Sequence, residues 1–287
     1  MDLASSLRDA TTRLAQAGVA SPEVDAEMLL AHVAGVSRGE LLAGVHSGKS
    51  VEKADLAQWE QLIVRRANRE PLQHLTGTAA FMSFEVKVGP GVFVPRPETQ
   101  SLVEHAISQA QAMAVREAGL HIVDLCSGSG VVAISLARAV LHASVVADEA
   151  SASAVEYLRQ NVDTLAPNIT VVASDVVSFG QSAQDASIDM IVANPPYVPS
   201  AEIPNDPEVA RYDPAMALYG GEDGLDTVHE IVTLAARALR PGGYLAIEHS
   251  NLQGDAMRSA LKDAGFRMVL TERDLVGRER FTQGFQS

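Results

Sequence analysis

The sequence lacks the residue patterns of a disulfide-stabilised, metal-binding or membrane protein. Its 287 residues include one cysteine, Cys126, which cannot form a disulfide within the chain, and its eight histidines show no metal-binding spacing. No apolar run reaches the roughly 18 residues of a membrane span, and the N-terminus carries charges where a signal peptide has an apolar block. We therefore expect a cytoplasmic protein that binds neither a metal nor a membrane.

Positive charge is also scarce. Lysine and arginine together number 22, against 36 aspartates and glutamates, so the formal net charge is −14. Such a chain repels a polyphosphate backbone unless a local basic patch compensates. Two small groups, Arg65 with Arg66 and Arg69, and Arg278 with Arg280, are interpreted as solvated surface. Direct nucleic-acid binding is therefore disfavoured.

The chain is longer than a single domain usually is, and its first part carries only helical patterns. SRGE (37–40) has the form of a capping box, and Ser21 followed by Pro22 is typical of a helix start. GVHSGKS (44–50) resembles a phosphate-binding loop, but it has three residues between its glycines where four are required, so we interpret it as a turn. We predict a helical domain over residues 1–80.

A hairpin linker is predicted over residues 81–97. FMSFEVKV (81–88) alternates like a strand, GPG (89–91) signals a turn, and VFVP (92–95) suggests a returning strand. Residues 98–287 then alternate short apolar strands with helices, which indicates a mostly parallel sheet covered on both faces. The strands are expected at HIVDL (121–125), SVVAD (144–148), ITVVA (169–173), DMIVA (189–193), YLAIE (244–248) and FRMVL (266–270).

A glycine loop follows the first of these strands. In HIVDLCSGSGVVAISLA (121–137) the strand passes through Asp124 into a tight loop and then an apolar helix. Gly128 and Gly130 let the backbone turn sharply and approach a ligand beside exposed helix N–H groups. Ala133 also completes the dinucleotide pattern GxGxxG/A, so the loop alone does not distinguish a nicotinamide cofactor from another nucleoside-bearing cofactor.

Acidic residues end the next two strands. Glu149 lies about 20 residues beyond the glycine loop, where a carboxylate can accept hydrogen bonds from both hydroxyls of a ribose. We favour it over its neighbour Asp148 for this role. One strand further, Asp175 with Val176 could frame an adenine ring. The alternative is that these acids only cap the helices that follow them.

The strand DMIVA runs directly into Asn194, Pro195, Pro196 and Tyr197. A parallel strand delivers the residues after its carboxyl end to the edge where ligands bind, and two prolines stop the strand and stiffen the turn. The Asn194 amide oxygen and the Pro195 carbonyl can accept the two hydrogens of a planar NH₂ group, which stacks on Tyr197. Holding both hydrogens aims the nitrogen lone pair at an electrophile. The alternative is a stiff loop without chemistry.

These motifs together resemble the release-factor glutamine methyltransferases, the PrmC/HemK family. NPPY alone is shared with amino-methyltransferases of DNA and RNA, and the N-terminal segments make the resemblance narrower. Cys126 stands where the family usually has glycine, and Gln100 where it usually has glutamate. The resemblance rests on PLQHLTG (71–77), VPRPET (94–99), DLCSGSG (124–130), Glu149, NPPY (194–197), DPAMALYGGEDGL (213–225), YLAIEHS (244–250) and DLVGRERF (274–281).

The resemblance implies a seven-stranded, Rossmann-like class I methyltransferase domain that binds S-adenosylmethionine, behind a helical substrate-recognition domain. In that family the methyl group goes to the side-chain amide nitrogen of the glutamine in the GGQ loop of peptide chain release factors. The residues that the resemblance assigns to the cofactor are Asp124, Cys126, Ser127, Gly128, Ser129, Gly130, Glu149, Asp175, Val176 and Asn194. Those assigned to the glutamine amide and its transfer are Asn194, Pro195, Pro196 and Tyr197.

Four other interpretations remain, of which the first explains the same motifs and the other three explain fewer of them. A ribosomal-protein glutamine is the target in a sister family with the same motifs, and an adenine N6 amino group in nucleic acid would suit NPPY but not the negative charge. A nicotinamide-dependent oxidoreductase would leave NPPY without a role. A non-catalytic adaptor would leave both sites without one. Neither Cys126 nor Ser127 lies in a nucleophile elbow, so we assign neither as a nucleophile.

Overall fold

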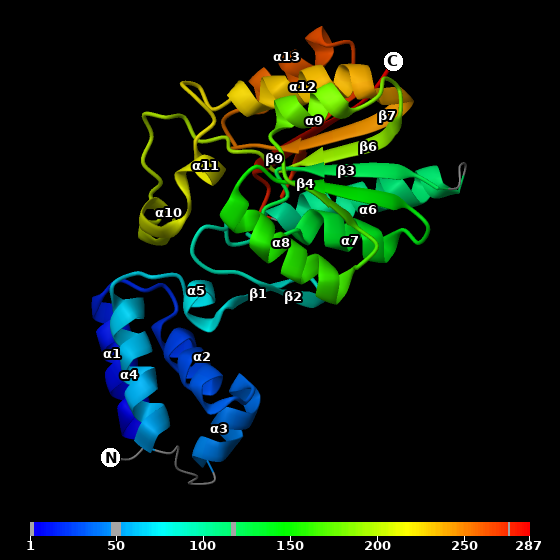
Figure 1. Ribbon diagram of the computed structural model, residues 1–287. Coiled ribbons are helices and arrows are strands. Elements are labelled where there is room, and N and C mark those ends of the chain that lie inside the picture. Colours follow the sequence, from blue (N-terminus) through cyan, green and yellow to red (C-terminus); the bar gives the residue numbers. More distant parts are fainter. Residues whose placement is uncertain (1–2, 47–52, 116–118, 275) are drawn as a thin grey trace. The chain divides into compact units, whose positions relative to one another are not determined.

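The computed structural model describes residues 3–46, 53–115, 119–274 and 276–287 (Figure 1). The chain forms two compact units, one made of Met1–Thr78 with Asn205–Tyr212 and the other of Ala79–Pro204 with Asp213–Ser287. We call them the helical unit and the sheet unit. Within the described ranges, no helix has the length and apolar character needed to cross a membrane.

The helical unit packs its helices around one apolar core. The indole of Trp59 is buried in this core and donates a hydrogen bond to the carbonyl of Ala26 at 3.0 Å. Leu14, Leu30 and Ile63 are fully buried beside it. The elements of this unit are α1 (Leu3–Gln16), α2 (Pro22–Ala34), α3 (Arg38–His46), α4 (Lys53–Ala67), α5 (Leu72–Thr76) and α10 (Pro207–Tyr212).

The predicted capping box at the start of α3 is confirmed. The hydroxyl of Ser37 accepts from the N–H of Glu40 at 3.2 Å, and the Glu40 carboxylate accepts from the N–H of Ser37 at 2.8 Å. α2 begins at Pro22 as expected, but among the described contacts the Ser21 side chain makes no capping hydrogen bond. The turn expected at 44–50 falls mostly on residues outside the described ranges.

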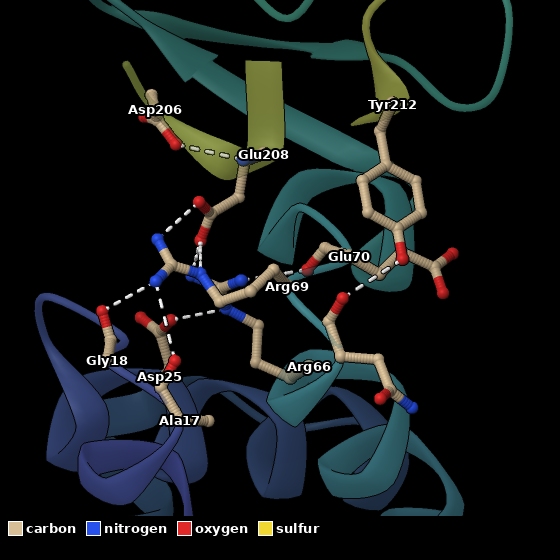
Figure 2. Close-up of polar contacts among 10 residues, drawn as sticks. Ala17, Gly18, Asp25, Arg66, Arg69, Glu70, Asp206, Glu208 and Tyr212 are labelled. Carbon is tan, nitrogen blue, oxygen red and sulfur yellow. Dashed lines mark hydrogen bonds and ion pairs between the residues drawn. The ribbon is translucent and has the colours of Figure 1, made fainter. Parts of the chain in front are cut away.

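A buried ion cluster binds α10 to the other helices of its unit (Figure 2). The Glu208 carboxylate pairs with the Arg66 guanidinium at 2.8 Å and with that of Arg69, and Arg66 also donates to Asp25 at 2.8 Å. Burial opposes the charge on Glu208, but hydrogen bonds from Arg69 and Arg66 hold the pKa of its carboxyl at about 2. The cluster therefore ties a segment from far along the chain to the N-terminal helices.

This cluster corrects the interpretation of the arginine groups as solvated surface. Arg66 is buried, and so is Arg280 in the second group. Each is paired with a carboxylate, Arg66 with Asp25 and Glu208, and Arg280 with Asp274 at 3.5 Å. These carboxylates could not be predicted from the sequence pattern. Asp25 and Glu208 lie far from Arg66 in the chain, and a turn separates Asp274 from Arg280.

The linker hairpin is present, but its turn lies earlier than predicted. β1 (Thr78–Phe81) and β2 (Phe84–Lys87) pair with each other, so the turn falls at Met82 and Ser83 rather than at 89–91, and residues 92–95 form no strand. Met82 takes a left-handed φ of 49°, and the turn places the Phe81 and Phe84 rings 6.1 Å apart. Prolines on both sides of 91–94 remove ladder donors, which explains the missing strand.

The sheet unit is a seven-stranded sheet with helices on both faces, which confirms the predicted fold class (Figure 1). The strand order is β5-β4-β3-β6-β7-β9-β8. The strands are β3 (His121–Leu125), β4 (Ser144–Asp148), β5 (Thr170–Val172), β6 (Ile188–Ala193), β7 (Leu239–Glu248), β8 (Arg267–Arg273) and β9 (Glu279–Phe285). The helices are α6 (Thr99–Ala114), α7 (Val131–Ala139), α8 (Ala152–Leu165), α9 (Val176–Ser182), α11 (Ala215–Leu218), α12 (Asp226–Ala238) and α13 (Gly254–Asp263).

Side chains of the central strands alternate between two apolar layers. Met190 and Val192 of β6 pack with α6, α7 and α8, whereas Ile191 and Ala193 pack with α9, α12 and α13. Both faces of β6 are therefore buried, which is why its residues 190–193 form a continuous apolar run and not an alternating one.

The strand β9 was not expected from the residue pattern. Its sequence, ERFTQGF, has four polar residues and no apolar alternation, yet most of the strand is buried because it lies between β7 and β8. It runs antiparallel to both neighbours, with Glu248 of β7 opposite Phe281 of β9. The parallel part of the sheet is therefore β5-β4-β3-β6-β7.

We expect Glu208→Gln to lower the free energy of unfolding by about 3 kcal/mol at pH 7, because it removes a carboxylate partner from the buried guanidinium of Arg66 and from the partly buried one of Arg69. Ionised Glu208 stabilises the fold because its folded pKa, about 2, lies below its ordinary value. The higher unfolding free energy of wild type relative to Glu208→Gln should persist above about pH 5 and disappear as the pH falls toward 2. Unfolding followed by circular dichroism measures both, and equal losses in the exposed control Glu222→Gln would contradict the role of the cluster.

Candidate active site

The register of three parallel strands brings the predicted site segments to one edge of the sheet. Leu125 at the end of β3 pairs with Asp148 at the end of β4 and with Ala193 at the end of β6. The glycine loop, Glu149 and Asn194 each follow directly after one of these residues. The glycine loop and Asn194, which are more than 60 residues apart in the chain, therefore emerge with Glu149 at the same edge, at the carboxyl ends of the strands.

The loop after β3 is held in a strained, left-handed path. Gly128 and Gly130 have φ of 55° and 89°, and a Cβ on Gly130 would lie 2.6 Å from the Leu158 side chain. A Cβ on Gly128 would meet nothing within 4 Å, so there is open space on that side of the loop. Cys126 adopts a φ of 58°, a conformation that favours glycine. A glycine at this position would carry no such strain.

Asp124 is buried beneath the loop. Its Oδ2 accepts from the N–H of Ala133 at 3.1 Å, and its Oδ1 is buried without a hydrogen-bond partner among the described residues. Burial raises the pKa of this carboxyl to about 7, against the effect of hydrogen bonds from Ser127 and Ala133. Buried carboxyl oxygens are normally hydrogen-bonded, so Asp124 Oδ1 is suited to accept a hydrogen bond from a polar group of a bound ligand.

Glu149 and Asp148 have different surroundings although they are adjacent. The two oxygens of Glu149 accept from the N–H of Gly128 at 2.8 Å and the N–H of Ser151 at 2.7 Å, so the carboxylate is held between the glycine loop and the start of α8. Each oxygen keeps a lone pair for a further donor. Asp148 is almost fully buried and accepts from the Ser174 hydroxyl at 2.6 Å. Burial raises the pKa of Asp148 to about 7.

Asp175 and Val176 begin α9. The Asp175 carboxylate accepts from the N–H of Ser178 at 2.7 Å, so it caps the helix as the simpler interpretation expects. Val176 is buried in the apolar layer that includes α12. These contacts show that both residues stabilise the fold. Their assignment to an adenine ring stays a prediction.

Close backbone contacts fix the NPPY turn. A Cβ on Gly220 would lie 2.4 Å from the Pro196 carbonyl oxygen, and one on Gly224 would lie 2.2 Å from that of Tyr197. The Tyr197 carbonyl also accepts from the Gln253 side chain at 3.0 Å. The segment DPAMALYGGEDGL therefore contains glycines because the turn packs directly on its backbone.

The polar groups of the turn divide into anchored and available ones. The Nδ2 of Asn194 donates to the Thr99 hydroxyl at 3.3 Å, and the Tyr197 hydroxyl lies 3.5 Å from Oε1 of Glu248. In the described part of the chain no donor reaches the Asn194 Oδ1 or the Pro195 carbonyl. Two acceptors on consecutive residues thus remain for an external NH₂ group.

Thr99 and Glu248 were missed by the analysis of sequence motifs as members of this site. Glu248 ends β7 next to β6, so the rule that drew attention to Asp124 and Glu149 would have selected it as another acidic strand end. Thr99 closes the VPRPET segment, and no local spacing points from it to Asn194. Only the fold shows that the start of α6 meets the end of β6.

The structure also bears on nucleophilic and metal chemistry. Burial and the carboxylates of Glu149 and Asp124 raise the pKa of the Cys126 thiol, which keeps it protonated at neutral pH and a poor nucleophile. Among the residues that the structure describes, no group of His, Cys, Asp and Glu side chains is arranged to hold a metal ion.

The fold is that of the class I methyltransferases. A 16S rRNA methyltransferase of T. Thermophilus, solved with AdoMet and guanosine, superimposes with a TM-score of 0.54 at 23% identity, covering 73% of this chain and 50% of that chain. A methyltransferase from Pyrococcus furiosus gives a TM-score of 0.51 at 18% identity, covering 72% of this chain and 91% of that one. Both likenesses concern the fold.

Sequence comparison places the chain within this class. Residues 5–77 match the PrmC N-terminal domain and residues 97–206 the methyltransferase small domain. Release factor glutamine methyltransferases from Mycolicibacterium smegmatis and Streptomyces coelicolor are 45% and 42% identical, each over 97% of this chain and 96% of the relative. One from Deinococcus radiodurans is 37% identical over 99% and 98%. The chain belongs to the family of release factor glutamine methyltransferases.

Family membership settles two of the earlier alternatives. The protein is an S-adenosylmethionine-dependent methyltransferase, so the glycine loop does not belong to a nicotinamide-dependent oxidoreductase. The non-catalytic adaptor is excluded for the same reason.

We expect Gly224→Ala to lower the free energy of unfolding by about 2 kcal/mol more than Gly242→Ala does, because only the first adds a methyl group in collision with the NPPY turn. The two glycines share a φ of 79°, and a Cβ on Gly242 meets nothing within 4 Å. Gly242→Ala therefore controls for backbone strain. Urea unfolding measures both, and equal losses would show that the turn does not depend on this contact.

A second prediction concerns pH. Burial raises the pKa of Glu248 to about 7 despite hydrogen bonds from Thr99 and Tyr197, so the folded protein keeps a proton that the unfolded chain releases. Wild-type stability should therefore fall as the pH rises from about 4.5 to 7 through this group. Glu248→Gln cannot ionise and should gain up to about 3 kcal/mol relative to wild type between pH 5 and 8. Melting curves at several pH values test this, with exposed Glu156→Gln as the control that should show no such gain.

Proposed function

We propose that this protein transfers a methyl group from S-adenosylmethionine to the side-chain amide nitrogen of the glutamine in the GGQ loop of peptide chain release factors. The observation that carries the proposal is the pair of available acceptors, Asn194 Oδ1 and the Pro195 carbonyl, beside the glycine loop. Full-length similarity to proteins named release factor glutamine methyltransferases supports the choice of substrate. We infer from this substrate a part in translation termination and a location in the cytoplasm.

The residues at the sheet edge suit S-adenosylmethionine. The loop residues Cys126, Ser127, Gly128, Ser129 and Gly130 would line its methionine part, next to the open space at Gly128 and the unsatisfied Asp124 Oδ1. Glu149, with its carboxylate already oriented by two backbone N–H groups, would accept the ribose hydroxyls. Asp175 and Val176 would lie at the adenine.

Glu149 is preferred over Asp148 for the ribose on structural grounds. Asp148 is almost fully buried, and one of its oxygens is taken by Ser174. Glu149 is less buried and keeps lone pairs free on both oxygens.

The NPPY turn would hold the glutamine. Asn194 Oδ1 and the Pro195 carbonyl each accept one amide hydrogen, which sets the plane of the nitrogen, while Pro196 and Tyr197 form the walls of the slot. When bound, S-adenosylmethionine supplies the methyl carbon, which leaves sulfur as the amide nitrogen bonds to it, and the nitrogen then loses a proton. An amide nitrogen is a poor nucleophile because its lone pair is delocalised, so orientation by fixed acceptors is the main contribution of these residues. No side chain has to remove a proton before attack.

The helical domain over residues 1–80 is proposed to recognise the release factor, joined by the linker 81–97 to the methyltransferase domain over 98–287. The match of residues 5–77 to the PrmC N-terminal domain supports this division. The net charge of −14 argues against a nucleic-acid substrate.

The direct test is mass spectrometry of a release factor incubated with the protein and S-adenosylmethionine. We expect one added methyl group on the glutamine of the GGQ tripeptide. A release factor that stays unmodified, or that carries the methyl group on another residue, would contradict the proposal.

Asn194→Ala should reduce the rate of methyl transfer roughly a hundredfold or more while cofactor affinity stays within a few-fold, because one substrate acceptor is lost and Glu149 is untouched. Single-turnover methylation and isothermal titration with S-adenosylmethionine measure the two quantities. Turnover equal to wild type would refute the role of Asn194.

A further inference from the structure

We propose that Glu208 is a positioning residue for the release factor, because it attaches α10 to the N-terminal helices and thereby connects the helical unit to the NPPY turn. The inference rests on the proposed function and deepens it, since it names a residue on which binding of an intact protein substrate depends. Glu208 touches neither the glutamine nor the cofactor in that proposal. It acts through the chain segment that carries it.

The chain passes between the two units at three places. The first follows Thr78, and the other two lie on either side of α10, after Pro204 and after Tyr212. The NPPY turn ends at Tyr197, so only residues 198–204 separate it from the second of these places. The segment with α10 is therefore a second covalent connection between the helices and the sheet, in addition to the one that leads into the hairpin.

The loop that carries α10 (residues 201–217) is closed at its base by backbone hydrogen bonds next to the NPPY turn. The N–H of Val198 donates to the Leu218 carbonyl at 2.8 Å, and the Val198 carbonyl accepts from the N–H of Gly220 at 3.0 Å. The N–H of Ser200 donates to the Gly221 carbonyl at 2.8 Å. The residues that leave the turn and those that return to it are thus bonded to each other.

The return from α10 to the sheet unit is anchored on both sides of one peptide bond. Tyr212, the last residue of α10, donates its hydroxyl hydrogen to the Asn68 carbonyl at 3.2 Å within the helical unit (Figure 2). Asp213 is the next residue and belongs to the sheet unit, where its buried carboxylate pairs with the Arg96 guanidinium at 2.5 Å. No unanchored residue separates these two attachments.

Polar contacts hold α10 in the helical unit. Of its six residues, all of which the structure describes, Glu208 is the buried one, and none belongs to the described apolar core of this unit. Figure 2 shows the Glu208 carboxylate between the guanidinium groups of Arg66 and Arg69. Arg69 donates its Nε to Oε1 at 2.8 Å and its Nη2 to Oε2, so this pair is bidentate. Arg69 also donates to the Gly18 carbonyl at 2.7 Å, which extends the attachment to the start of α2.

An attachment built on one carboxylate favours a defined position over stability. Replacing a buried ion pair by packed apolar side chains is often neutral or stabilising, whereas a bidentate pair fixes one orientation of the two partners. A release factor that contacts both the helices and the NPPY turn binds more tightly when a short connection joins the two, because the effective concentration of the second contact falls as the connection lengthens. Without Glu208, α10 would lose its attachment to the helices, and only the connection after Thr78 would remain.

The deciding measurement is KM for an intact release factor, compared with kcat, at a temperature where circular dichroism shows each variant folded. Glu208→Gln removes the charge and keeps the shape, so we expect KM to rise on the order of tenfold while kcat and the affinity for S-adenosylmethionine stay within about threefold. A purely structural role would lower the active fraction, and hence kcat, without changing KM. The control Glu70→Gln removes a carboxylate that accepts from Arg65 Nε at 2.8 Å in the same unit, and it should keep the wild-type KM.

A second variant tests the connection and leaves the ion cluster unchanged. Gly-Ser-Gly-Ser is inserted between Glu202 and Ile203, which are both exposed, and again between Tyr212 and Asp213. The insertions lengthen the chain on both sides of α10, and added loop residues cost little stability. We expect KM for the release factor to rise on the order of tenfold here as well, with kcat within about threefold of wild type.

A wild-type KM in Glu208→Gln or in the insertion variant would overturn the inference, and so would a fall in kcat at unchanged KM. If Glu208→Gln does not fold, the insertion variant decides alone. A wild-type protein that binds S-adenosylmethionine but leaves the release factor unmethylated would instead contradict the proposed function.

Discussion

The parallel register of β3, β4 and β6 is the constraint on which the site depends. Because Leu125 pairs with both Asp148 and Ala193, the residues that follow these three positions must lie at the same edge of the sheet. A shift of one strand by a single residue would turn its side chains to the other face and separate Glu149 or Asn194 from the glycine loop. The two apolar layers that bury both faces of β6 are what hold this register.

The site is rigid, and its buried carboxyl groups lower the stability of the fold. Its turn is fixed by two prolines, by glycine backbones within contact of two carbonyl oxygens, and by the Gln253 side chain. Burial disfavours the ionised form of its carboxyl groups and raises the pKa of Asp124, Asp148 and Glu248 to about 7 in each case. None of these groups would be chosen for stability alone. A reaction that depends on orienting a weak nucleophile gives a physical reason to keep them.

The sequence predicted what local chemistry determines and missed what depends on distant partners. Glycine spacing, strand-end acids and the NPPY turn identified the residues at the sheet edge, and the apolar runs identified six strands of the sheet. β9 was missed because it is buried by the neighbouring strands β7 and β8, which its polar sequence does not indicate. The hairpin turn was misplaced because Met82 adopts a left-handed φ, which is not expected of methionine. Arg66 looked like surface until Asp25 and Glu208 appeared beside it.

The most direct measurement of the central claim is a solved complex of the protein with the demethylated cofactor product and a peptide containing the GGQ glutamine. The account predicts that the substrate NH₂ group lies within hydrogen-bonding distance of both Asn194 Oδ1 and the Pro195 carbonyl, with Asn194 Nδ2 still on Thr99. A glutamine side chain held elsewhere, or an Asn194 amide turned with its nitrogen toward the substrate, would contradict it.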